Sequence, residues 1–215
     1  MAVFIVAVSG QPTITAHEWL LFILFGICST IHLVLTRPAE ERRRAAHLRD
    51  KVEHIDQTSV WLFSAALLLP VTLVIALLAL LRGQRYLIAR KRPSTFIATS
   101  AFIGLSALGA FVVARVTPVH GWLTSDRTTD ISTSAVTLTL AMSSAVVVYF
   151  GVQAALIAVS RVLISGKWSL DTLLGSRADN VLEVHTLLIG VFAAVVGAFA
   201  MPALFAVTAV ASYST

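Results

Sequence analysis

Four of the six histidines lie at or near the ends of long apolar runs, where imidazole side chains could hold a redox cofactor. Ligation of haem b by two imidazoles takes one histidine from each of two facing helices. If the chain crosses a membrane five times, His17 and His185 fall near one face. His32 and His120 then fall near the other face. This arrangement predicts two histidine pairs at two depths, as a transmembrane di-haem subunit requires.

His32 differs from the other three because it lies about one helical turn inside the end of the first apolar run. An ionisable side chain within a membrane span is a candidate functional residue. We expect it to act as a haem or metal ligand, a quinone hydrogen-bond donor or a proton relay. A packing hydrogen bond to Ser29 or to a neighbouring helix explains it equally well. For His17, His120 and His185, hydrogen bonds at the membrane interface are the simpler interpretation.

Two carboxylates stand at the third position of helix N-cap patterns. Glu18 follows Thr15, and Glu183 follows Asn180. In a capping box the two side chains satisfy amides that the first helical turn leaves without partners. Capping is therefore the favoured interpretation, and a membrane enzyme acting on lipid through His17, Glu18, His185 and Glu183 is an alternative.

The composition places these residues in a membrane protein. The chain has 215 residues, of which 57% are hydrophobic and 13% charged, whereas a soluble domain is about one quarter charged. The single cysteine, Cys28, excludes an intrachain disulfide. The net charge of +5 comes from bases clustered between apolar runs, which favours contact with lipid headgroups over binding of nucleic acid.

Five apolar runs are long enough to cross a hydrocarbon core of about 30 Å, so we expect one all-α transmembrane bundle over residues 1–215. The predicted spans cover residues 16–36, 59–81, 95–116, 134–159 and 184–210. Pro70 lies in the middle of the second run and predicts a kink there. Residues 38–57 carry a narrow apolar stripe on a charged helix, which predicts an amphipathic helix at the interface that begins at Pro38.

Tryptophans and small residues add two further expectations. The four tryptophans (Trp19, Trp61, Trp122 and Trp168) fall near predicted helix ends, which is typical of aromatic belts at the headgroups. Small residues form one stripe in the third span and another in the last, which predicts close helix contacts. The stripes are Ser100, Gly104 and Ala107, and Gly190, Ala194 and Gly197.

The distribution of basic residues leaves two topologies open. Five full spans divide the sixteen lysines and arginines equally, eight to each side. If residues 59–81 instead form a re-entrant hairpin bent at Pro70, fourteen bases share one side against two on the other. The second arrangement obeys the positive-inside rule. Five spans, with a cytoplasmic N-terminus in the cytoplasmic (inner) membrane, are the first interpretation because each half of a hairpin would be short.

These features predict an integral subunit of a larger membrane complex, either accessory or associated with electron transfer through haem b or quinone. We expect no catalytic activity of its own. The expected partners are the lipid bilayer and other membrane subunits or further copies of the chain. A small-solute or ion transporter or channel is the alternative, with a path lined by residues that are polar or break a helix. These residues are Pro70, Ser143, Ser144, Gln153 and Pro202.

Overall fold

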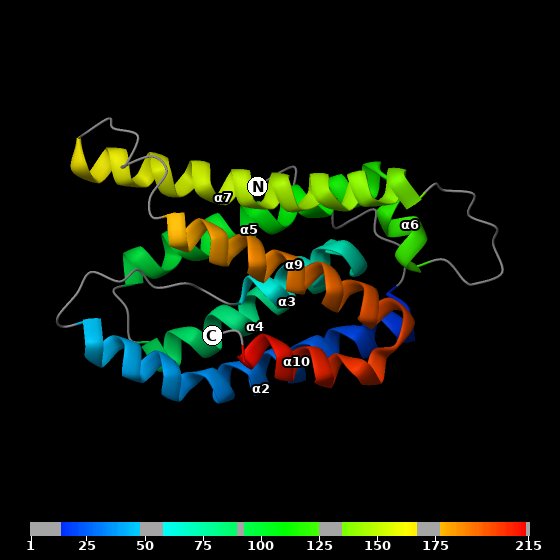
Figure 1. Cartoon of the computed structure of the whole chain (residues 1–215), viewed down its shortest axis with the longest axis horizontal. Coiled ribbons are helices and arrows are strands. Elements are labelled where there is room, and N and C mark those ends of the chain that lie inside the picture. Colours follow the sequence, from blue (N-terminus) through cyan, green and yellow to red (C-terminus); the bar gives the residue numbers. More distant parts are fainter. Residues whose placement is uncertain (1–13, 48–57, 90–92, 125–134, 167–176, 214–215) are drawn as a thin grey trace.

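The computed structural model describes residues 14–47, 58–89, 93–124, 135–166 and 177–213, which are all-helical and contain no strand. The helices are listed here in chain order (Figure 1): α2 (Ala16–His47), α3 (Ser59–Leu68), α4 (Val71–Ala89), α5 (Pro93–Val116), α6 (Val119–Thr124), α7 (Ala135–Ser165), α9 (Arg177–Phe199), the 3₁₀ turn η1 (Met201–Ala203) and α10 (Leu204–Tyr213).

Four of these helices are long and apolar enough to cross a membrane. Their candidate spans are Ala16–Pro38, Pro93–Val116, Ala135–Ile164 and Asn180–Phe199. The first three match predicted spans closely. The all-helical class is confirmed, and four such helices are consistent with a multi-pass membrane protein. The run at residues 59–81 is divided between α3 and α4.

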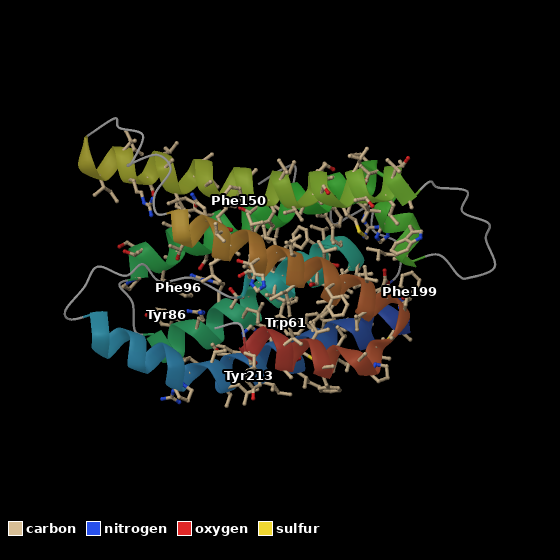
Figure 2. All side chains as sticks on the ribbon, viewed as in Figure 1. Trp61, Tyr86, Phe96, Phe150, Phe199 and Tyr213 are labelled. Atoms are coloured by element: carbon tan, nitrogen blue, oxygen red, sulfur yellow. The ribbon has the colours of Figure 1, made fainter. Side chains whose placement is uncertain are left out.

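The bundle has two ends, which we name by a residue at each end of the first span. The Glu18 end holds the start of α2, the end of α5, α6 and the end of α9, on the right of Figure 1. The Arg37 end holds the ends of α4 and α7 and the starts of α5 and α9. Phe199 lies at the first end, and Tyr86 and Phe96 lie together toward the second (Figure 2), with ring centroids 5.0 Å apart.

Helices α3 and α4 form a hairpin that reaches the Glu18 end at Pro70. The amide of Leu69 donates to the carbonyl of Ala65 at 2.7 Å, and the helix stops there because proline has no amide hydrogen. Leu69 is extended, with φ −95° and ψ 155°, as expected for a residue before proline. The chain then reverses, and α4 returns to the Arg37 end, where Arg82 contacts the second turn of α5. The kink predicted at Pro70 is therefore a complete reversal.

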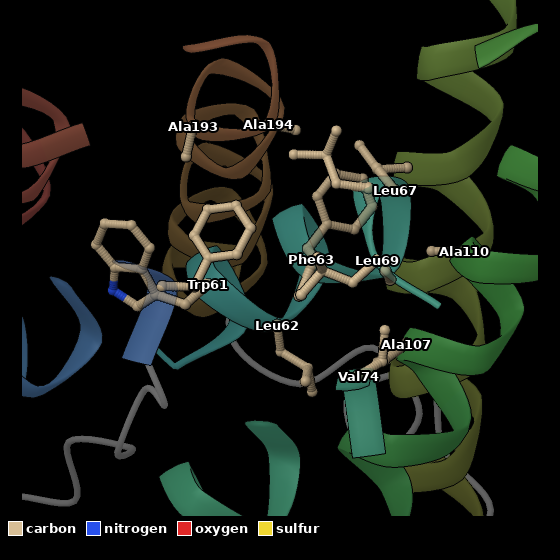
Figure 3. Packing of buried hydrophobic residues seen from close by; sticks show 14 of the residues in the cluster. Trp61, Leu62, Phe63, Leu67, Leu69, Val74, Ala107, Ala110, Ala193 and Ala194 are labelled. Atoms are coloured by element: carbon tan, nitrogen blue, oxygen red, sulfur yellow. The ribbon is translucent and has the colours of Figure 1, made fainter. Parts of the chain in front are cut away.

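Helix α3 is the centre of the core, and all ten of its residues are buried. Trp61 points toward α2 and Phe63 toward α5 and α7 (Figure 3), where the Phe63 ring meets Tyr149 edge-on at 5.5 Å. A helix that is apolar on every side requires protein around its whole circumference or lipid. Here α2, α4, α5 and α9 surround it.

The two stripes of small residues bring helices against the hairpin. A Cβ atom on Gly104 would lie 3.0 Å from the side chain of Leu78 on α4. One on Gly190 would lie 3.0 Å from the carbonyl oxygen of Val60 on α3, and Gly197 faces Leu68 of the same helix. Both predicted contact faces are confirmed, and the hairpin is what they contact.

Two predicted boundaries are wrong. Helix α2 continues through Pro38 to His47, so Pro38 does not begin a separate amphipathic helix; residues 48–57 of that prediction lie outside the described part of the chain. The last apolar run, predicted at 184–210, is broken after Phe199 because Pro202 falls in η1. Helix α10 then turns back and packs on α2.

Candidate functional site

The histidine pairs expected from five spans are not formed. His17 lies in the first turn of α2 at the Glu18 end, and His185 lies near the start of α9 at the opposite end. His32 lies toward the Arg37 end of α2, whereas His120 is on α6 at the Glu18 end. The reason is the reversal between α3 and α4, after which each later helix runs in the direction opposite to the one that a single continuous span would give it. His17 and His185 are both exposed.

His32 is buried, with 4% of its surface exposed, and is bonded to the central helix. The indole Nε1–H of Trp61 donates to Nδ1 of His32 at 3.0 Å, and the two rings meet edge-on. Trp61 is itself only 1% exposed, so its predicted place in a headgroup belt is wrong. Trp19 is exposed, and Trp122 packs edge-on against Phe199 at 5.0 Å.

The bond from Trp61 determines what His32 can do. Indole nitrogen only donates, so Nδ1 of His32 carries no proton and a neutral ring has its hydrogen on Nε2. Haem iron binds the lone pair of a neutral ring nitrogen, and in this ring Nδ1 is occupied while Nε2 is protonated. While the Trp61 bond is kept, His32 is suited to donate a hydrogen bond through Nε2 and is unsuited to ligate haem.

His120 and Arg115 meet at the C-terminal end of α3. The guanidinium of Arg115 donates to Nε2 of His120 and, through Nη2, to the carbonyl oxygen of Leu69 at 3.2 Å. Nδ1 of His120 lies 3.1 Å from the carbonyl oxygen of Leu67. The Leu67 carbonyl belongs to the last turn of α3 and Leu69 directly follows the helix, at a point where a helix lacks amide donors of its own. Arg115 therefore caps the buried helix.

Burial, more than the neighbouring charges, favours the neutral form of His120. Burial lowers the pKa of His120 below its usual 6.5, the Leu67 bond partly offsets this, the Arg115 charge lowers the pKa further, and Glu18 raises it. A carbonyl only accepts and a guanidinium only donates. Nδ1 therefore carries the hydrogen, and Nε2 is the acceptor.

One of the two cap predictions is confirmed. The Thr15 amide donates to Oε2 of Glu18 at 2.7 Å, and the Glu18 amide donates to the Thr15 hydroxyl at 3.2 Å. The second is wrong, because α9 begins at Arg177 and Glu183 is a buried residue of its second turn. With Glu18 and Glu183 at opposite ends, the four residues of the predicted lipid-acting site do not come together.

Sequence reasoning passed over Arg82, which anchors α4 to α5. Its guanidinium donates to the hydroxyls of Ser100 and Thr99 at 2.8 and 2.9 Å. It also lies 4.8 Å from the ring centroid of Phe96. The signal in the sequence is an arginine directly after the apolar run at residues 59–81. Among the described residues no group of three or more His, Cys, Asp or Glu is placed to hold a metal ion.

No protein family matches the chain, and neither a curated protein nor a solved structure is significantly similar to it.

Proposed function

We propose that the chain is an accessory integral subunit of a larger membrane complex and that α7 is the helix that contacts its partner. The observation that carries the proposal is the outer face of α7. Only 17% of its span is buried within the chain, against 22% for α5, 39% for α2 and 44% for α9. Helix α7 is therefore the span with the most surface left for lipid or another protein.

The exposed face of α7 carries three small residues, Ser143, Gly151 and Ala155. Gly151 and Ala155 are four residues apart, and Ser143 lies eight residues before Gly151, with the exposed Val147 between them. A Cβ atom added at Gly151 would meet no atom within 4 Å. Lipid tails are as apolar as leucine, so helices associate in bilayers through close backbone packing, which small residues permit. The buried stripes of α5 and α9 serve that purpose inside the chain. The α7 stripe has the same character without a neighbour in the described chain, which favours a transmembrane helix of another subunit.

The other functions receive less support. Electron transfer through bis-histidine haem needs two imidazoles that face one iron. His32 is bonded to Trp61 and His120 to Arg115 and Leu67, and His17 and His185 are exposed. The transport path would join Ser143, Ser144 and Gln153 to the helix breaks. Ser143 is exposed on α7, Ser144 donates to the Ala141 carbonyl of its own helix, and the Pro70 break is capped by Arg115 and His120.

For the topology, we propose four full spans and an α3–α4 hairpin that enters and leaves the membrane at the Arg37 end. This is the topology with a re-entrant hairpin bent at Pro70, and we prefer it to five full spans. Fourteen of the sixteen bases then share one side, which the positive-inside rule assigns to the cytoplasm of a cell (inner) membrane. The N-terminus faces the opposite side, in place of the cytoplasmic position first favoured. Irregular backbone at Leu69–Pro70 is compatible with this depth because protein side chains satisfy its carbonyls.

The test of the subunit proposal is purification of the tagged full chain from its own membrane in mild detergent. The Gly151→Leu variant is compared with Gly83→Leu, a matched control because Gly83 is also exposed on a helix with no atom within 4 Å of an added Cβ. We expect Gly151→Leu to lose the co-purifying subunits. Its affinity for them should fall about tenfold or more, equivalent to about 1.4 kcal/mol. The control should retain them.

Three results would contradict the proposal. The first is retention of every partner by Gly151→Leu, and the second is a wild-type chain that purifies alone as a monomer. In the third, the wild-type chain co-purifies only with further copies of itself, and Gly151→Leu separates these copies. The partner would then be a second copy and not another subunit.

A further inference from the structure

We propose that Arg115 and His120 form a pH-sensitive lock on the α3–α4 hairpin, closed while His120 is neutral and opened when its imidazole takes up a proton. This inference goes beyond the proposed function and does not depend on the identity of a partner. It rests on the hydrogen bonds at the end of α3.

The hairpin needs side-chain donors at this point. Helix α3 ends at Leu68 and Pro70 supplies no amide hydrogen, so the carbonyls of the last turn lack the partners a continuing helix would give. Leu67 receives the Nδ1–H of His120, and Leu69 receives Arg115. A buried carbonyl left without a donor costs free energy comparable to a lost hydrogen bond, so these two side chains hold the reversal in place.

The two side chains are joined through the one ring atom that titrates. Nε2 of neutral His120 accepts from the Arg115 guanidinium, whereas imidazolium has a hydrogen on both nitrogens and accepts nothing. A proton on Nε2 therefore replaces a hydrogen bond by the contact of two cations. Because Arg115 keeps its charge over the whole physiological range, it must move away, and the Leu69 carbonyl loses its donor.

Few other charges act on this pair. Glu18 on α2 is the acid that faces it, and its charge acts on both Arg115 and His120. His17 is exposed beside Glu18. The elements packed against α6 are α3, α5, α7 and α9. In their described residues at this end, Arg115 is the one basic or carboxylate side chain. Displaced from His120, the guanidinium has Glu18 as its nearest alternative partner.

The direction of the pH dependence follows from the folded structure. Burial and Arg115 place the pKa of His120 below its usual 6.5 in the folded chain. The unfolded chain therefore binds the proton more readily, and the contribution of the lock is complete above about pH 6.5. It is lost as the pH falls from there through the folded pKa. In the proposed topology the Glu18 end faces away from the cytoplasm, so the lock responds to acid outside the cell.

The experiment measures amide hydrogen exchange of residues 71–76 in the full chain in detergent, corrected for the intrinsic effect of pH. Measurements at about pH 7.5 and about pH 5 bracket the ordinary histidine pKa of about 6.5. In the wild type we expect protection to fall about tenfold or more at the lower pH, equivalent to about 1.4 kcal/mol. The His120→Gln variant can still donate to Leu67 and accept from Arg115 but cannot be protonated, so its protection should not change.

Equal loss of protection in the wild type and His120→Gln would overturn the proposal, as would no loss in either. If His120→Gln does not fold, Arg115→Gln gives the second test. The amide that replaces the guanidinium is uncharged, and its oxygen can accept a hydrogen bond from imidazolium, so protection should no longer fall at the lower pH. If Arg115 only stabilised the fold, the variant would lose protection at both pH values and keep the fall between them, and that result would also overturn the lock.

Discussion

The bond between Trp61 and His32 shows how a single contact changes the chemistry open to a residue. From the sequence, His32 was a candidate haem ligand, quinone donor or packing residue, and Trp61 was an interfacial aromatic. Their contact buries both rings and fixes the hydrogen of neutral His32 on Nε2. Ligation of haem is thereby disfavoured, because Nδ1 is occupied and Nε2 carries the hydrogen.

We expect Trp61→Phe to destabilise the chain by about 1–3 kcal/mol, because it removes a donor from a buried acceptor. The measurement is reversible unfolding in mixed micelles. Trp19→Phe is the control, since Trp19 is 47% exposed and should change stability by less than about 0.5 kcal/mol. Equal effects of the two substitutions would show that the His32 bond contributes nothing specific.

At the scale of elements, the short helix α3 organises the bundle because α2, α4, α5 and α9 all pack directly on it. Gly190 is the closest approach, and the Ser64 hydroxyl donates to its carbonyl oxygen at 2.7 Å. The stripe of small residues on α9 could be recognised from its spacing. That it faces a ten-residue helix buried inside the bundle could not, since spacing does not name the partner of a helix face.

Substitution of Gly190 tests this packing. An added Cβ would lie 3.0 Å from the Val60 carbonyl oxygen and 3.1 Å from the Phe63 ring, so we expect Gly190→Ala to destabilise by about 1–3 kcal/mol through overpacking. Gly83→Ala has open space and should stabilise by up to about 1 kcal/mol from helix propensity alone. Unfolding in mixed micelles measures both, and a stabilised Gly190→Ala variant would show that the α3–α9 contact is loose.

At the scale of the whole molecule, the hairpin decides which ends meet. The proposed topology can be tested against five spans with single cysteines in a Cys28→Ser background. Five spans put Ala16 and Ser94 on the same side, whereas the hairpin separates them. We expect a membrane-impermeant maleimide to label Ala16→Cys on intact cells and Ser94→Cys only after the membrane is opened.

Thr124→Cys supplies the control for this experiment, because it is exposed at the same end as Ala16 in the structure. It should be labelled together with Ala16→Cys. Labelling of Ala16→Cys and Ser94→Cys under the same condition would exclude the hairpin topology and restore five spans.

The sequence by itself determined what depends on composition and local pattern. Long apolar runs predicted a helical membrane protein, Thr15 and Glu18 predicted the start of α2, and the small-residue stripes predicted contact faces. Tertiary structure decided what depends on direction. Pro70 broke a helix in either case, but whether the chain continued or reversed depended on donors far along the sequence, Arg115 and His120, meeting the carbonyls of Leu67 and Leu69. That reversal separated the predicted histidine pairs, because every later helix then runs in the opposite direction.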